Sequence, residues 1–163
     1  MTPDILCLGK SLTGGTLPLA VTMATTEVFA AFYDDEADHA LMHGPTYMGN
    51  PLCCAAASAA IDLFESRPVA DEVARIERLG REWLGPLAAL PQVKEVRCRG
   101  GFLAVETTTP FDRRALAPLI LERSVWLRPI GPVIYATPPF TITEGELRQV
   151  ADAMAAAVRA QAP

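Results

Sequence analysis

Residues 5–15, ILCLGKSLTGG, place one lysine directly after a short apolar run and between glycines. The run Ile5–Leu8 predicts a buried β-strand, and a lysine at the end of such a strand is costly unless it has a partner or a chemical role. The neutral amine of a lysine attacks carbonyl groups, and glycines let a ligand approach the backbone closely. Lys10 is therefore a candidate for covalent attachment to a carbonyl compound such as pyridoxal phosphate (PLP). The alternative is a lysine whose ammonium group simply reaches solvent.

Composition limits the classes of protein that fit this chain of 163 residues. Half of the residues are hydrophobic, which is enough for a core in one modest domain or two small lobes. A net charge of −5 and scattered basic residues argue against nucleic acid as a partner. No apolar run reaches the length of a membrane span, so we expect no membrane partner. The four cysteines show neither metal-ligand nor disulfide spacing, and we expect a reducing, cytoplasmic location.

The first part of the chain predicts two strands and two helices. Leu19–Met23 is the second predicted strand, and Thr26 is expected to cap a short helix, Glu27–Tyr33. Residues 39–49 have no period and predict a loop. Asn50 then caps a helix whose first residue is Pro51, and this helix is expected to end near Ser66.

The pattern changes at Arg67-Pro68, where we expect a domain boundary. Beyond it, apolar residues recur at helical spacing through Trp83, and Asp112 and Thr143 are expected to cap two further helices. The helix that Asp112 caps is expected to continue to Ser124, and Trp126 to lie in the core or an interface. Extended patterns predict strands at Val93–Cys98, Phe102–Glu106, Val125–Leu127 and Val133–Ala136. This second lobe is thus predicted to be a small sheet covered by helices, within an overall α/β fold.

Two further segments could carry chemistry. The loop from His43 to Thr46 precedes a capped helix and offers a hydroxyl and backbone N–H groups to a phosphate, although an ordinary Gly-Pro turn is the alternative. Arg128 lies among apolar residues at the predicted end of a strand, where a guanidinium suits a carboxylate; the alternative is a structural ion pair. Tyr135 follows on the next strand and could lie nearby.

Together these segments resemble the class III aminotransferases, which have the fold type I architecture of PLP-dependent transferases. The resemblance rests on residues 5–15, on MHGPTYMGNPL at residues 42–52, and on WLRP at residues 126–129 followed by Ile134-Tyr135 and Pro138-Pro139. The Gly-Pro-Thr-aromatic-Met-Gly-Asn-Pro form of the loop looks like the branch that makes 7,8-diaminononanoate for biotin. Ornithine, acetylornithine and 4-aminobutyrate aminotransferases carry related loops and remain the alternative.

The resemblance implies roles for particular residues. Lys10 would hold PLP covalently and act as the catalytic base, and Pro45 and Thr46 would contact the PLP phosphate bound by the other subunit of a homodimer. Gly44 would contact the keto-acid substrate, Arg128 would bind its carboxylate, and Tyr135 would line the substrate pocket. The amino donor would be S-adenosylmethionine or lysine. No residue is expected to bind a metal.

The resemblance also implies that other parts of the active site precede Lys10 in the family. We therefore expect residues 1–67 to be the C-terminal part of the large PLP-binding domain and residues 68–163 to be the small C-terminal domain. On that basis the chain by itself is expected to be inactive. A non-catalytic fragment or a pseudoenzyme is the remaining alternative.

Overall fold

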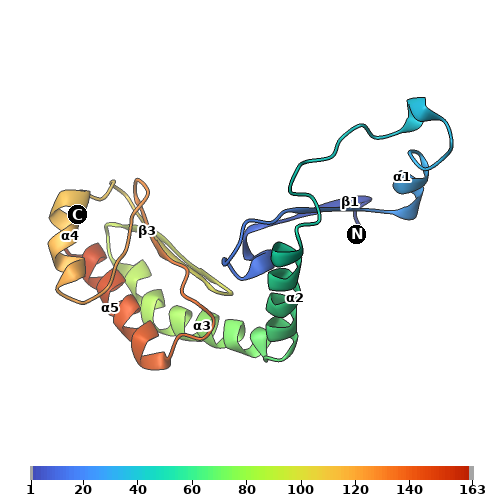
Figure 1. The fold of residues 1–163 in the computed structure, drawn as a ribbon. Coiled ribbons are helices and arrows are strands. Elements are labelled where there is room, and N and C mark those ends of the chain that lie inside the picture. Colours follow the sequence, from blue (N-terminus) through green and yellow to red (C-terminus); the bar gives the residue numbers. More distant parts are fainter. Residues whose placement is uncertain (1, 162–163) are drawn as a thin grey trace. The chain divides into compact units, whose positions relative to one another are not determined.

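The computed structural model describes residues 2–161 of the chain. Figure 1 shows the elements in chain order: β1 (Ile5–Leu8), η1 (Lys10–Thr13), β2 (Val21–Ala24), α1 (Thr26–Ala30), η2 (Ala37–His39), α2 (Pro51–Glu65), α3 (Val69–Leu84), η3 (Gly85–Ala89), β3 (Val93–Arg99), β4 (Phe102–Thr107), α4 (Arg113–Leu121), β5 (Val133–Ala136) and α5 (Glu144–Arg159). No helix within the described residues combines the length and the apolarity needed to cross a membrane.

The chain divides into two compact units, the first ending at Arg67 and the second beginning at Pro68. In the first unit, β1 and β2 form an antiparallel ribbon in which Leu6 pairs with Met23. The short helix η1 follows β1 and lies against α2. Asn50 caps α2, as its sequence predicts, because its side-chain oxygen accepts hydrogen bonds from the amides of Leu52 and Cys53 at 3.0 and 3.2 Å.

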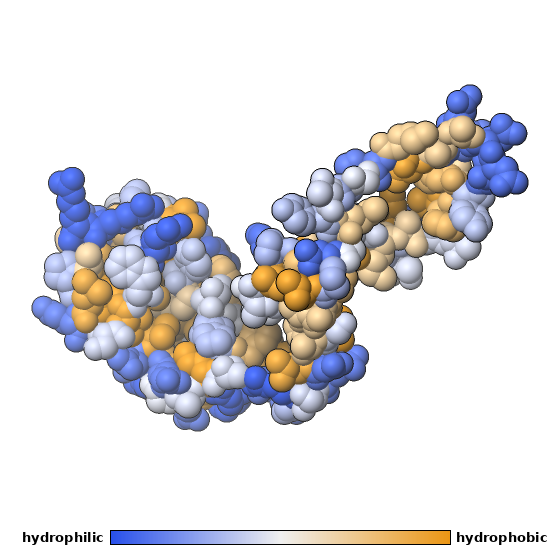
Figure 2. All heavy atoms as spheres, in the orientation of Figure 1, coloured by the Kyte–Doolittle hydropathy of each residue, from blue (hydrophilic) through white to orange (hydrophobic). Residues whose placement is uncertain are grey.

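The prediction that β1 is buried is wrong for this chain. All four residues of β1 are exposed, and Ile5 keeps 56% of its surface accessible. The physical reason is that β1 pairs only with β2 among the described residues, and an isolated ribbon has no second layer to cover it. Figure 2 shows apolar residues at the molecular surface, and the exposed large hydrophobic residues of the first unit include Met23, Met42 and Leu52.

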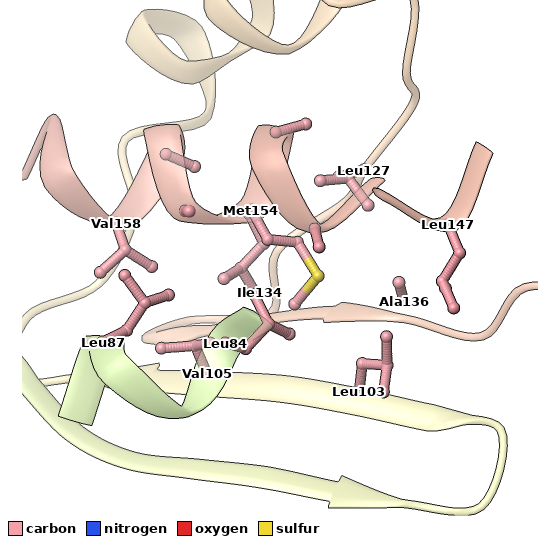
Figure 3. Close-up of a cluster of buried hydrophobic side chains, with 14 of the residues drawn as sticks. Leu84, Leu87, Leu103, Val105, Leu127, Ile134, Ala136, Leu147, Met154 and Val158 are labelled. Atoms are coloured by element: carbon pink, nitrogen blue, oxygen red, sulfur yellow. The ribbon is translucent and has the colours of Figure 1, made fainter. Parts of the chain in front are cut away.

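The second unit is built on an antiparallel sheet with the strand order β3-β4-β5. The helices α3 and α5 pack on this sheet, and α4 packs on α5. The core between them is apolar and almost fully buried, and Figure 3 shows how side chains from sheet and helices meet there. Its labelled members are Leu84, Leu87, Leu103, Val105, Leu127, Ile134, Ala136, Leu147, Met154 and Val158.

Local capping explains the helix boundaries and two small differences from the sequence prediction. The capping box of α5 forms as predicted, because the hydroxyl of Thr143 and the side chain of Glu146 each bond to the other residue's backbone amide. The sequence prediction placed the cap of the short helix α1 one residue too late, because Thr25 and not Thr26 caps it. The helix also ends earlier than predicted, at Ala30. The helix α4 is capped by Asp112 but ends at Leu121, before Ser124 turns the chain with a φ of +52°.

Close packing of α3 on the sheet predicts a large cost for one added methyl group. A Cβ at Gly80 would lie 2.3 Å from Cδ2 of Leu103 and 3.4 Å from Sγ of Cys98, both of which are buried. We therefore expect Gly80→Ala to lower the free energy of unfolding by about 1–3 kcal/mol, because Leu103 must leave its packed position. Urea denaturation of the second unit, followed by tryptophan emission, measures this change.

Gly145→Ala is the matched control, because nothing lies within 4 Å of a Cβ at Gly145 in α5. It is expected to leave the free energy of unfolding unchanged or to raise it by up to about 1 kcal/mol, since alanine favours helix over glycine. Equal destabilisation by both substitutions would contradict this account of the helix–sheet contact.

Candidate active site

Lys10 is presented to solvent by the turn that follows β1. Gly9 is fully extended, and Lys10 then adopts a φ of +50°, in the left-handed region that residues with a Cβ rarely occupy. Its side chain is exposed, so the prediction of a buried strand-end lysine is wrong; the residue begins η1 instead of ending the strand. Within residues 2–161 the amine makes no ion pair or hydrogen bond, which leaves it accessible to a ligand.

The turn that carries Lys10 is fixed by the residues after it. Thr13 is 2% exposed, and its hydroxyl donates a hydrogen bond to the carbonyl of Leu17. Gly14 follows with a φ of +62°, and a Cβ there would contact Ala60 of α2 at 3.8 Å. An unusual backbone conformation persists only where its surroundings determine it, and the buried Thr13 against α2 supplies that restraint for Lys10.

The loop before α2 presents Gly44, Pro45 and Thr46 to solvent. It is shaped by backbone turns, because the amide of Met48 donates to the carbonyl of Pro45 at 3.0 Å and the amide of Asn50 donates to that of Tyr47 at 3.2 Å. The Thr46 hydroxyl has no hydrogen-bond partner within the described part of the chain. The side chain of Asn50 accepts hydrogen bonds from the first amides of α2, so these amides are not free to bind a phosphate. Donors for a phosphate must therefore come from the loop.

Arg128 lies on an extended segment between α4 and β5. The predicted strand Val125–Leu127 does not form, because this segment pairs with no strand and its first ladder contact is the isolated bridge between Ile130 and Val133. Burial nevertheless alternates along it: Leu127 is 8% exposed, whereas Trp126 is 72% exposed and Arg128 is also exposed. Trp126 and Arg128 therefore project to the same side. Trp126 lies outside the core, and its alternative place in an interface stays a prediction.

The structure brings Arg128 and Tyr135 together in one open cavity of about 880 Å³ within the second unit. Its walls come from the segment around Trp126, from the end of β5 and from the beginning of α5. The guanidinium of Arg128 makes no ion pair within residues 2–161, so the alternative of a structural ion pair finds no partner there. A free guanidinium and a phenol in one cavity suit a ligand with a carboxylate.

Tyr135 is held in place by an aromatic neighbour on the adjoining strand. The ring of Phe102 lies 5.7 Å from the ring of Tyr135, and the two planes are inclined by only 13°. Tyr135 pairs in register with Ala104 of β4, two residues beyond Phe102. This stacking restricts the phenol ring to one orientation at the edge of the cavity.

An ion-pair network lies on the face of the sheet from which Tyr135 projects, because Arg97 and Tyr135 are both register partners of Ala104. The carboxylate of Glu106 accepts hydrogen bonds from Lys94 at 2.6 Å and from Arg97 at 2.7 Å, and Arg97 also contacts Glu95. These contacts lower the pKa of Glu106, with the Lys94 bond the larger cause, and they raise the pKa of Arg97. Lys94 is therefore engaged in a surface ion pair, whereas Lys10 has no ion-pair partner among the described residues.

Two carboxylates with lowered pKa values, Glu77 and Glu146, make the stability of the second unit depend on pH. The amide of Gly100, followed by the guanidinium of Arg81, lowers the pKa of Glu77, and the hydroxyl and amide of Thr143 lower that of Glu146. When a folded-state pKa lies below the unfolded value of about 4.3, the unfolded chain takes up protons first on acidification. The stability from these groups is therefore present above about pH 4.3 and is lost as the pH falls through their folded pKa values.

We expect urea midpoints, followed by tryptophan emission, to stay level at neutral pH and to fall below about pH 4.3. Both tryptophans lie in the second unit, so this signal reports that unit alone. Glu77→Gln should lower the midpoint at pH 7 and weaken its fall in acid, whereas Glu82→Gln should change little. Glu82 is the matched control because it lies on the same helix and only approaches Arg78 at 3.8 Å.

These residues fit the chemistry of PLP, which the resemblance implies. Covalent attachment needs an accessible primary amine, and Lys10 supplies one on a restrained turn. A phosphate needs free hydrogen-bond donors, and Thr46 supplies a hydroxyl with no partner in the described part of the chain. A carboxylate substrate needs a cation, and Arg128 supplies one within a cavity.

Comparisons with known proteins show to which protein family the chain is similar. The family model described as aminotransferase class-III matches residues 1–158. The adenosylmethionine-8-amino-7-oxononanoate aminotransferase of Corynebacterium glutamicum is 36% identical over 98% of this chain and 38% of its own length. The enzyme of the same name from Methanocaldococcus jannaschii is 38% identical over 96% of this chain and 37% of its own. The chain thus spans somewhat more than a third of the length of these relatives.

Solved structures agree with the sequence comparison. The crystal structure of the Methanocaldococcus jannaschii enzyme matches with a TM-score of 0.84 and 38% identity, over 97% of this chain and 39% of that one. A PLP-bound amine transaminase from an uncultivated Pseudomonas species matches with a TM-score of 0.82 and 34% identity, over 96% and 38%. The fold is therefore part of the PLP-dependent transaminase fold, and the chain belongs to the class III aminotransferases.

Proposed function

We propose that the native protein carrying this chain uses PLP to convert 8-amino-7-oxononanoate to 7,8-diaminononanoate, with S-adenosylmethionine as the amino donor. The observation that carries this proposal is the match of nearly the whole chain to relatives that bear the name adenosylmethionine-8-amino-7-oxononanoate aminotransferase. The form of the loop at residues 42–52 supports the same branch of the family. Because the chain covers only part of those relatives, the proposal concerns the native protein. Residues 1–67 would belong to its PLP-binding domain and residues 68–163 to its small domain.

Residues of the first unit would bind the cofactor and carry out the proton transfer. Lys10 would hold the cofactor covalently through Nζ, and the same amine would act as the base that removes and returns a proton at the substrate carbon. When bound, PLP would supply the electron sink that makes this carbon acidic. Pro45 and Thr46 would contact its phosphate, and Gly44 would leave room for the keto acid.

The second unit would supply the recognition of the keto acid. Arg128 would bind the carboxylate, because its guanidinium lies free in a cavity, and Tyr135 would line the same cavity from β5. The exposed position of Thr46 is compatible with a contact to the cofactor of a second subunit, so we include a homodimer in the proposal. The four free cysteines accord with a cytoplasmic location.

A substrate panel tests the proposed reaction. The native protein, loaded with PLP, is given S-adenosylmethionine or lysine as donor and 8-amino-7-oxononanoate as acceptor, and the 7,8-diaminononanoate formed is measured by mass spectrometry. Parallel reactions pair ornithine, acetylornithine or 4-aminobutyrate with 2-oxoglutarate. We expect turnover of 8-amino-7-oxononanoate alone, with S-adenosylmethionine the better donor. Preferred turnover of one of the other amines would replace this proposal with the corresponding activity.

A further inference from the structure

The phenol of Tyr135 reaches the cavity without a hydrogen bond that would fix it there. Its neighbours Ile134 and Ala136 belong to the core, so Tyr135 points to the opposite face of the sheet and lines the cavity from there. The hydroxyl has no hydrogen-bond partner within residues 2–161. The orientation of this ring must therefore come from packing.

Phe102 supplies that packing from the adjoining strand. Its ring stacks on Tyr135 across the diagonal of β4 and β5, a separation at which aromatic side chains of a sheet still interact. Phe102 is neither among the residues that line the cavity nor among those of the core, and 44% of its surface is exposed. Phe102 can therefore influence a ligand in the cavity only through Tyr135.

The turn from which Phe102 projects is fastened to α3. Phe102 is the first residue of β4 and pairs with Arg99 at the end of the hairpin. Between them, the amide of Gly100 donates a hydrogen bond to Oε2 of Glu77 at 2.5 Å. Two hydrogen bonds from Arg81, at 3.0 and 2.9 Å, hold the other oxygen of that carboxylate. The helix thus fixes the backbone that carries the Phe102 ring.

We propose that Phe102 is a positioning residue of the keto-acid site, which holds the phenol of Tyr135 at the cavity and does not itself touch the substrate. The inference rests on the proposed function, which places the keto acid beside Tyr135. Without the stack, Tyr135 would be free to adopt other rotamers over the open face of the sheet, and ordering its ring would oppose substrate binding. Loss of the Phe102 ring should therefore weaken keto-acid binding and leave the chemical step unchanged.

A fluorine label at position 135 reports the stack directly. The native protein, with a ring-fluorinated tyrosine in place of Tyr135 alone, is examined by fluorine NMR when folded and in urea. A stacked ring shifts the resonance of its neighbour, so Phe102→Leu should move the folded resonance toward its value in urea. Phe102→Tyr keeps a ring and should leave the resonance close to that of the parent. An unmoved resonance in Phe102→Leu would overturn the proposal.

Arg99→Ala is the matched control for both this measurement and the kinetics. It removes the side chain of the residue that pairs with Phe102 and leaves both rings in place, and Arg99 does not line the cavity. The fluorine resonance and the KM for the keto acid should therefore match those of the parent. A shift as large as that of Phe102→Leu would assign the effect to the end of the hairpin and not to the stack.

Kinetics show whether the stack matters for substrate binding. Phe102→Leu should raise the KM for 8-amino-7-oxononanoate by about twofold to tenfold, and Phe102→Tyr should restore it. The kcat and the KM for the amino donor should change by less than about twofold. Because Phe102 acts through Tyr135, Phe102→Leu should have no further effect on the KM in a protein that carries Tyr135→Ala. Additive effects of the two substitutions, or an equal rise in both KM values, would contradict the positioning role.

The two readouts separate this inference from the proposed function. If the native protein prefers another substrate pair, while the fluorine resonance and the KM for its own acceptor still depend on Phe102, the proposed reaction fails and the positioning role stands. If the proposed reaction is found but Phe102→Leu behaves like Arg99→Ala, the positioning role fails alone.

Discussion

Lys10→Ala is expected to abolish transamination by the native protein. The proposed role combines covalent attachment of PLP with proton transfer, and loss of a positioned base alone costs about 10²–10⁴-fold in rate. The turn that carries Lys10 is held by the buried Thr13, so the substitution should leave the fold intact. Single-turnover rates with the purified, PLP-treated protein measure the effect.

The chain supplies its own control for this experiment. Lys94 is the only other lysine, and it pairs with Glu106 on the sheet of the second unit. Lys94→Ala should therefore keep the rate within about twofold of the parent, since exposed ion pairs contribute little. Lys10→Arg should be as inactive as Lys10→Ala, because a guanidinium stays protonated and cannot attack a carbonyl. Comparable losses in Lys10→Ala and Lys94→Ala would contradict the assignment.

Arg128→Ala is expected to raise the KM for the keto acid by about 10- to 100-fold. A charge-assisted contact of this kind contributes about 1.5–3 kcal/mol, and Arg128 makes no ion pair with another described residue. The KM for the amino donor should change much less. Steady-state kinetics with each substrate varied in turn separate the two values.

Arg128→Lys and Arg99→Ala complete this comparison. Lysine keeps the charge but loses the planar pair of donors, so Arg128→Lys should fall between the parent and the alanine variant. Arg99 is an exposed arginine at the end of β3 that does not line the cavity, and its removal should leave both KM values unchanged. An equal rise in the two KM values of Arg128→Ala would assign the residue a general structural role.

Much of the second unit could be predicted from the sequence because its signals are local. Asp112 and Thr143 cap their helices, and both interactions lie within three residues of chain. The spacing of apolar residues in α3 and α5 likewise reports which face is buried. The hairpin of β3 and β4 turns at Gly100, which has a φ of +56°.

The failed predictions depended on partners distant in sequence. The apolar run of β1 indicates a strand correctly, but burial requires a covering layer that the described residues do not supply. Residues 125–127 have an extended pattern, yet a strand requires a neighbour with free backbone groups, and β5 pairs with β4 on one side only. Residue type alone cannot report either circumstance.

The sequence indicates individual candidate site residues from their local context, but it does not show which of them lie together in the fold. Lys10, Thr46 and Arg128 carry chemistry that their neighbours in sequence make visible. Trp126 was assigned to the core or an interface and not to the site, although it shares the two-residue alternation of Arg128. Only the folded unit shows that Trp126 and Arg128 line one cavity.

The most direct test of the central claim is to find where the cofactor is attached. The native protein is incubated with PLP, reduced with borohydride, digested and mapped by mass spectrometry. We expect the pyridoxyl group on Lys10 in the parent protein, and none in Lys10→Ala. A pyridoxyl group on Lys94 or elsewhere in the parent protein, with Lys10 unmodified, would contradict the account.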